Sequence, residues 1–84
     1  MNPLILVVDD NKDILVNIKM TLEFNNYNVI TANSAERALE ILEESSELPD
    51  VILSDIMMPK MDGYEFFQEV SNNILWNDIP FIFL

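Results

Sequence analysis

Short apolar runs alternate with amphipathic segments along this chain, and this alternation constrains the fold more than any other feature. Leu4–Val8 and Val51–Leu53 are continuous runs rich in β-branched residues, which is typical of strands buried on both faces. Val29–Ala32 and Pro80–Leu84 predict two further strands. Because helical segments separate the four strands, the sequence predicts an α/β fold, with right-handed crossovers, a parallel sheet and helices on both of its faces.

Each predicted helix begins at a side chain that can cap it. Asp10 or Asn11 can cap the first helix, and Ser34 can cap the second. Asp62 and Glu65 have the spacing of a capping box at the start of the third. The helices are expected at Lys12–Phe24, Ala35–Glu44 and Asp62 to about Leu75. In the third helix, the apolar residues expected to face the core are Phe66, Phe67, Val70 and Ile74.

Length and composition restrict the ligands that this chain can bind. The 84 residues suffice for one small domain, and fifteen acidic residues against four basic ones give a net charge of −11. This charge disfavours direct contact with nucleic acid or with an anionic membrane, and favours a bound cation or a basic partner. No segment reads as a signal peptide or membrane span, and we expect a cytoplasmic protein. With no Cys and no His, any metal must be held by oxygen, which points to Mg²⁺ or Mn²⁺.

Three carboxylates follow two of the predicted strands. Asp9 and Asp10 end the first strand, and Asp55 follows the third. In open parallel sheets, ligands bind beyond the carboxyl ends of the strands, where the strand order reverses. If these two strands are neighbours, the carboxylates converge and repel one another, and a divalent cation would keep them ionised. Such a site suits phosphoryl transfer, with one carboxylate as the nucleophile.

Two segments together resemble the receiver domain of two-component response regulators. They are ILVVDDNKDI near the start and PDVILSDIMMPKMDGYEFF in the middle, and the resemblance extends over essentially residues 1–84. It implies a flavodoxin-like doubly wound sheet of order 2-1-3-4 and a phosphorelay signalling module rather than an enzyme. The partners implied are a histidine kinase or a phosphotransfer domain.

The same resemblance implies roles for individual residues. Asp55 would accept the phosphoryl group, Asp10 would bind Mg²⁺ directly, and Asp9 would act largely through water. The backbone carbonyl of Met57 would complete the ligands that the protein supplies. The Met57 side chain would lie beside the phosphoryl site, whereas Met58 is expected to pack in the core.

The chain departs from the family's pattern after its fourth strand. The family's switch hydroxyl, the lysine that ends its fifth strand and contacts the phosphoryl group, the fifth strand itself and the last two helices have no counterpart in residues 1–84. We therefore expect an incomplete receiver domain that is a poor switch even if it binds metal. The Phe81–Leu84 strand would be an open apolar edge, which favours self-association or strand exchange. A second apolar stripe, at Val16, Met20 and Phe24, is expected to contact the family's last helix or to dock a kinase.

Two alternative functions stay open at this point. One is a pseudo-receiver that acts by oligomerisation or protein contact without phosphorylation, although all three acidic residues are present. The other is a phosphatase of the haloacid dehalogenase type, which also uses an Asp nucleophile with Mg²⁺. That class has an Asp-x-Asp pattern after its first strand, whereas here the two Asp residues are adjacent, and the chain is short for that fold.

Overall fold

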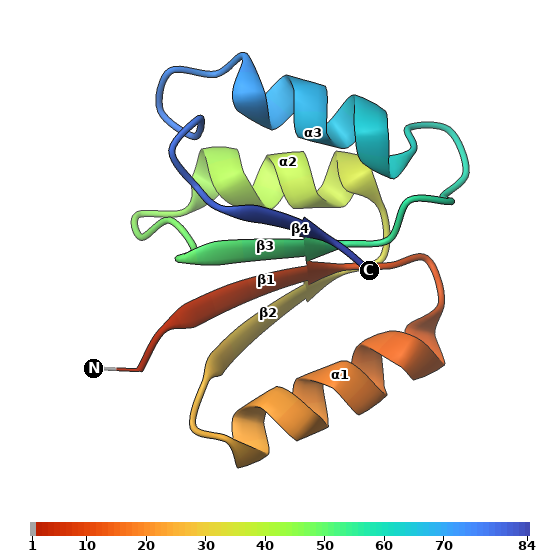
Figure 1. The fold of residues 1–84 in the computed structure, drawn as a ribbon, viewed down its shortest axis with the longest axis vertical. Helices are drawn as coiled ribbons and strands as arrows, with labels where there is room; N and C mark the ends of the chain where they lie inside the picture. The colour runs from red at the N-terminus through yellow and green to blue at the C-terminus, as the bar shows by residue number, and fades with distance from the viewer. Residues whose placement is uncertain (1) are drawn as a thin grey trace.

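Four strands and three helices alternate in the computed structural model, which describes residues 2–84 (Figure 1). The strands are β1 (Leu4–Val8), β2 (Asn28–Ala32), β3 (Val51–Ser54) and β4 (Phe81–Phe83), and the helices are α1 (Lys12–Phe24), α2 (Ala35–Glu44) and α3 (Gly63–Ser71). The predicted order of elements is confirmed. The bounds of β1 are as predicted, and no end of the other strands differs from its predicted position by more than one residue.

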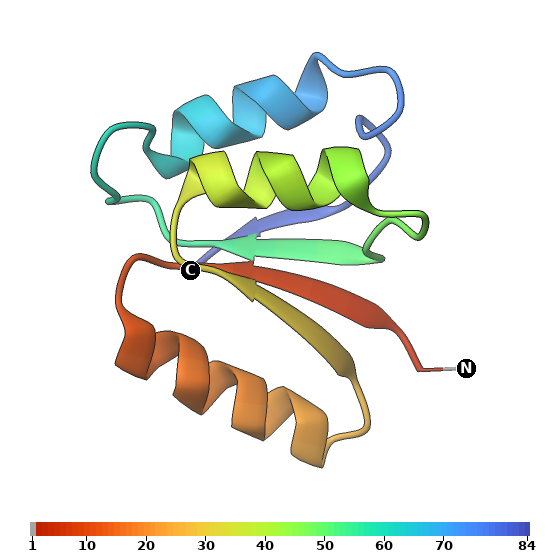
Figure 2. The same ribbon diagram turned by 180° about the vertical axis from the view of Figure 1, so that it is seen from behind.

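The strands form one parallel sheet in the order β2-β1-β3-β4. The predicted flavodoxin-like order is therefore confirmed. Helix α1 covers one face of the sheet, whereas α2 and α3 lie together on the other face (Figures 1 and 2). The order reverses at β1, because the chain moves from β1 outward to β2 and then crosses back to β3 on the other side of β1.

The sheet separates two hydrophobic clusters of different size. Successive residues of β1 alternate between them, because neighbouring side chains of a strand point to opposite faces. Leu6 and Val8 belong to a cluster of eleven buried residues on the face with α2 and α3. Ile5 and Val7 belong to the second cluster, in which Leu15 of α1 is the only other buried member. The two-sided burial predicted for β1 is confirmed.

The predicted caps are present. Asn11 Oδ1 accepts the backbone N–H groups of Asp13 and Ile14, so Asn11 rather than Asp10 caps α1. Ser34 caps α2, and Asp62 forms the predicted capping box at the start of α3. These side chains satisfy N–H groups that a helix leaves unpaired at its first turn.

The predicted extent of α3 is wrong. The helix ends at Ser71 rather than near Leu75, and Ile74, which was expected in the core, is 86% exposed. The side chain of Asn73 accepts the N–H of Leu75, and its carbonyl accepts the N–H of Trp76. Asn side chains compete in this way with helical hydrogen bonds, and the resulting turn buries Trp76 instead of Ile74.

Candidate functional site

Adjacent ends of β1 and β3 bring the predicted acidic residues together. The two strands pair in parallel with Val8 opposite Ser54, so Asp9 and Asp55 leave the sheet side by side. One carboxylate oxygen from each of Asp9, Asp10 and Asp55 lies within 4.8 Å of the other two. The predicted convergence of these three carboxylates is therefore present in the structure, at the point where the strand order reverses.

Asp9 is a charged group almost wholly removed from water. Its exposed fraction is 3%, and its Oδ1 accepts the backbone N–H of Asn11 at 2.9 Å. Burial raises the pKa of Asp9, and the nearby charges of Asp55 and Asp10 raise it further, while the Asn11 hydrogen bond lowers it in part. Without a cation, this carboxylate is thus in an unfavourable environment.

Asp55 is held by its backbone while part of its carboxylate stays available. Its N–H donates to the carbonyl of Val8 at 2.9 Å, which continues the β1–β3 pairing by one residue. Its Oδ1 accepts the N–H of Ile56 at 2.8 Å, whereas Oδ2 makes no hydrogen bond with the described residues. Asp55 is half-buried, and Asp10 is exposed to solvent. In this cluster Asp9 is therefore buried and Asp10 is exposed, while Asp55 is held in place with its Oδ2 free of hydrogen bonds to the described residues.

The backbone of Asp55 lies against Ser54 and Gly63, and the sequence did not predict either contact. Ser54 is completely buried, and its hydroxyl donates to the carbonyl of Asp55 at 2.9 Å. Gly63, the first residue of α3, donates its N–H to the carbonyl of Ile56 at 2.8 Å. A Cβ at Gly63 would overlap the carbonyl oxygen of Asp55 and lie 2.8 Å from the Cα of Ile56. Only glycine allows α3 to begin this close to Asp55.

The two methionines after Asp55 have different environments. Met58 is 8% exposed and packs in the larger cluster, as predicted. The Met57 side chain is 80% exposed. The role of the Met57 carbonyl as a metal ligand stays a prediction.

The donor set fits a hard divalent cation. Carboxylate oxygens are the ligands that Mg²⁺ and Mn²⁺ prefer, and three of them meet here from two strand ends. Burial, and then the charges of Asp55 and Asp10, raise the pKa of Asp9, so its negative charge is unfavourable at this point. A cation between these carboxylates would offset that charge.

Fold and site together define a class of protein: a doubly wound α/β domain with an acidic cluster at the switch point of its sheet. The family model described as the response regulator receiver domain matches residues 5–84. The chain belongs to this family, whose members are signalling modules of two-component systems. Receiver domains bind Mg²⁺ at an acidic cluster and interact with histidine kinases or phosphotransfer partners.

Curated relatives cover nearly all of this chain. It is 40% identical over 80 residues to the probable transcriptional regulator ycf27 of Guillardia theta, an alignment that covers 95% of this chain and 30% of the relative. It is 44% identical over 70 residues to the alkaline phosphatase synthesis transcriptional regulatory protein PhoP of Bacillus subtilis, covering 83% of this chain and 28% of PhoP. The chain thus spans less than a third of the length of these two relatives.

Solved structures show the same fold. The N-terminal domain of a response regulator receiver protein from Methanoculleus marisnigri superposes with a TM-score of 0.91 at 40% identity, covering 96% of this chain and 64% of that one. The chemotaxis protein CheY4 of Vibrio cholerae superposes with a TM-score of 0.91 at 31% identity, covering 99% of this chain and 68% of that one.

Among the helices described here, none is long and apolar enough to cross a membrane.

Proposed function

We propose that this chain is a phosphoacceptor module of a two-component phosphorelay and that Asp55 takes the phosphoryl group. The observation that carries the proposal is the position of the Asp55 carboxylate. It lies within 4.8 Å of two further carboxylates, and its Oδ2 is not engaged by the protein. A histidine kinase or a phosphotransfer domain would be the donor.

The chemistry at Asp55 is a displacement at phosphorus. Oδ2 attacks the phosphorus atom, a new O–P bond forms, and the P–N bond of the donor phosphohistidine breaks with its electron pair leaving on the imidazole. The hydrogen bond from the Ile56 N–H fixes Oδ1, so Oδ2 keeps one orientation. The Val8 and Gly63 contacts hold the backbone, which limits movement of the nucleophile during the reaction.

The same residues would hold the cation that this reaction needs. Asp10 is assigned as a direct ligand, Asp9 as a ligand that acts largely through water, and Asp55 and the Met57 carbonyl as the remaining ligands. When bound, Mg²⁺ or Mn²⁺ supplies positive charge that offsets the charge of the transferring phosphoryl group. The exposed Asp10 lies on the solvent side of the cluster, where a hydrated ion would enter.

Phosphorylation by acetyl phosphate with Mg²⁺ tests this function. Intact mass should show one phosphoryl adduct on the wild-type chain, and Asp55→Asn should abolish it. Asp78→Asn removes an exposed Asp that is not among the three clustered ones, and it should leave the adduct unchanged. Calorimetric titration with Mg²⁺ should show binding to the wild-type chain and a large loss of affinity in Asp10→Asn.

The outcomes separate the competing functions. A chain that binds neither Mg²⁺ nor the phosphoryl group would act as a pseudo-receiver, by protein contact alone. Multiple turnovers on a range of phosphate esters would identify a phosphatase. An adduct that persists in Asp55→Asn would place the acceptor elsewhere and contradict the proposal.

A further inference from the structure

Three of the four basic residues of this acidic chain line one cavity. The cavity has a volume of about 440 Å³, and its lining includes Lys12, Lys19 and Arg37, while Lys60 is the basic residue outside it. Fifteen acidic residues are present in the chain, yet none of them lines this cavity. The charged side chains that line the cavity are therefore all basic, on a protein with a net charge of −11.

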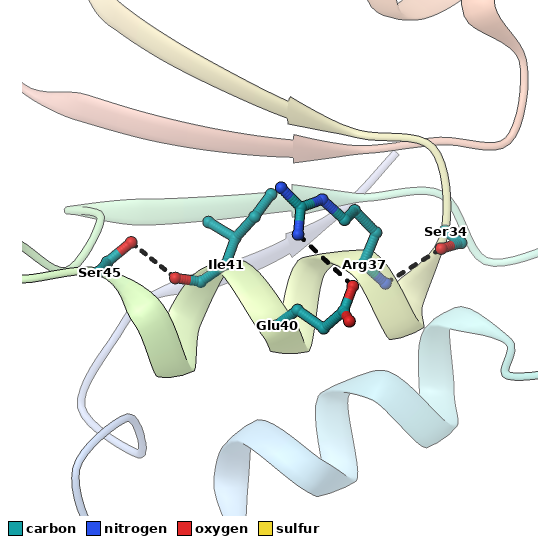
Figure 3. Close-up of polar contacts among 5 residues, drawn as sticks. All are labelled: Ser34, Arg37, Glu40, Ile41 and Ser45. Carbon is teal, nitrogen blue, oxygen red and sulfur yellow. Dashed lines mark hydrogen bonds and ion pairs between the residues drawn. The ribbon is translucent and has the colours of Figure 1, made fainter.

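Two of these three basic side chains form no ion pair with the described residues, and the third forms a weak one. Within residues 2–84, the one ion pair joins Arg37 to Glu40 at 3.5 Å, and both side chains are more than half exposed. Figure 3 shows that pair on α2, together with the hydrogen bond from the Arg37 N–H to the Ser34 hydroxyl. A separation of 3.5 Å in solvent gives a weak pair, so the guanidinium remains available. Lys12 and Lys19 form no ion pair with the described residues.

The cavity extends around the edge of the sheet at the carboxyl end of β2. Lys12 and Lys19 come from α1 on one face, and Arg37 comes from the first turns of α2 on the other. Thr31 and Asn33 add polar groups between them. Ligands of open α/β sheets bind at this end of the strands. The three basic residues thus line one cavity from opposite faces of the sheet, beside the carboxyl end of β2.

Apolar residues form the rest of the cavity lining. Leu15 and Ala32 are buried, and Val16, the first residue of the exposed stripe on α1, forms part of the lining. Val16 therefore lies on the β2 side of α1. A volume of this size falls in the usual range of about 300–1,000 Å³ for small-molecule sites, which combine apolar walls with a few polar groups.

We propose that this cavity binds a small organic phosphate with an apolar body, such as a nucleoside monophosphate. Lys12, Lys19 and Arg37 contact the phosphate, and Leu15 and Val16 contact the base. The site is separate from the acidic cluster, which repels phosphate when no divalent cation is present. The proposal does not depend on the phosphoacceptor function, because it concerns other residues and other chemistry.

Titration of the isotopically labelled chain with AMP, followed by amide NMR in Mg²⁺-free buffer at low salt, tests this site. Chelation of divalent cations keeps phosphate away from the acidic cluster, so a response there is not expected. AMP should shift the amides of residues 12–19 and 31–37 in a saturable way. Adenosine, which lacks the phosphate, and inorganic phosphate, which lacks the apolar body, should each bind at least about tenfold more weakly.

Charge variants distinguish binding of AMP in this cavity from nonspecific attraction of its phosphate to any lysine. Lys19→Glu should weaken AMP binding by about tenfold or more, and the milder Lys12→Gln should weaken it severalfold while retaining a folded spectrum. Lys60→Glu changes the net charge as much as Lys19→Glu but leaves the cavity intact, and it should alter affinity less than about twofold. Equal loss in Lys60→Glu and Lys19→Glu would overturn the proposal. So would equal affinity for AMP and adenosine, equal affinity for AMP and inorganic phosphate, or the absence of saturable shifts.

Discussion

The two faces of the sheet use the same four strands but are packed to different extents. On one face, α2, α3 and the Trp76 turn enclose eleven buried residues. On the other, α1 covers β1 and β2 while Ile82 of β4 remains 52% exposed. The acidic cluster lies at the carboxyl ends of β1 and β3. The Asp55 N–H donates to Val8 of β1, whereas Ser54 and Gly63 lie against the Asp55 carbonyl on the well-packed face. This difference indicates that packing on the α2 and α3 face contributes to the position of Asp55.

Large-to-small substitutions in the two clusters should show the difference between the two faces most clearly. Phe66→Ala removes a completely buried ring from the larger cluster and is expected to cost about 3–5 kcal/mol of unfolding free energy. Leu15→Ala on the α1 face should cost about 2 kcal/mol, because its surroundings are less enclosed. Urea unfolding measures both, and Phe66→Leu provides a milder variant. Equal costs at the two sites would contradict the difference between the faces.

Gly63→Ala tests whether the well-packed face positions Asp55. Its Cβ would overlap the Asp55 carbonyl, so either α3 or the Asp55 backbone must move, at a cost of about 1–3 kcal/mol. The rate of adduct formation with acetyl phosphate should fall even under conditions where the variant is fully folded. Ser71→Ala, at the exposed end of α3, is the matched control and should affect neither quantity. A normal rate in Gly63→Ala would show that α3 does not position the site.

Asp9→Asn should stabilise the metal-free domain by on the order of 1 kcal/mol. The substitution removes a buried charge and its repulsion with Asp55 and Asp10, while the amide oxygen can still accept the Asn11 N–H. In saturating Mg²⁺ the order should reverse, because the wild-type chain gains stability by binding the ion. If Asp9→Asn is less stable without metal, the acidic cluster is not a source of repulsion.

The raised pKa of Asp9 predicts how the stability difference between the wild-type chain and Asp9→Asn depends on pH. The folded state holds the proton more tightly than the unfolded state, whose pKa lies near the ordinary value of 3.8. The contribution of Asp9 to stability is therefore complete below that value and is lost as pH rises through the higher pKa of the folded state. The stability gained by Asp9→Asn in metal-free buffer should grow with pH across this interval and then become constant. Unfolding by urea at a series of pH values measures it, and a gain that shrinks with pH would contradict the assignment.

The smallest effect on stability is expected at Ile82 of β4, which is half exposed on the face that α1 partly covers. Ile82→Lys places a charge on the edge strand β4 and should change the unfolding free energy by no more than about 0.5 kcal/mol. When the 84-residue polypeptide is studied by itself, β4 is an edge strand, and an exposed apolar edge strand can pair with another chain. We therefore expect this polypeptide to self-associate through β4. Light scattering as a function of concentration should then show less association in Ile82→Lys. A wild-type chain that stays monomeric at all concentrations would contradict the expected self-association.

The sequence was sufficient to predict the features that depend on residues close together in the chain. The apolar runs set the strands, and Asn11, Ser34 and Asp62 set three helix starts, because strand burial and capping depend on neighbouring residues. The convergence of Asp9 and Asp55 also followed from sequence, since parallel strands place their carboxyl ends at one edge. The error at α3 arose because Asn73 forms a turn that helical periodicity alone does not reveal.

Other features depend on distances between segments remote in the chain, and only the tertiary structure decided them. The burial of Asp9 results from packing around the end of β1, whereas its neighbour Asp10 is exposed. The close approach of Gly63 to Asp55 depends on how α3 docks against β3. Lys19 and Arg37 are separated by a strand and lie on different helices, so no sequence pattern groups them. The sequence by itself determined the helices, the strands and the Asp residues that follow β1 and β3. Packing between remote segments determined that Asp9 is buried, that Asp55 is held in place and that three basic residues line one cavity.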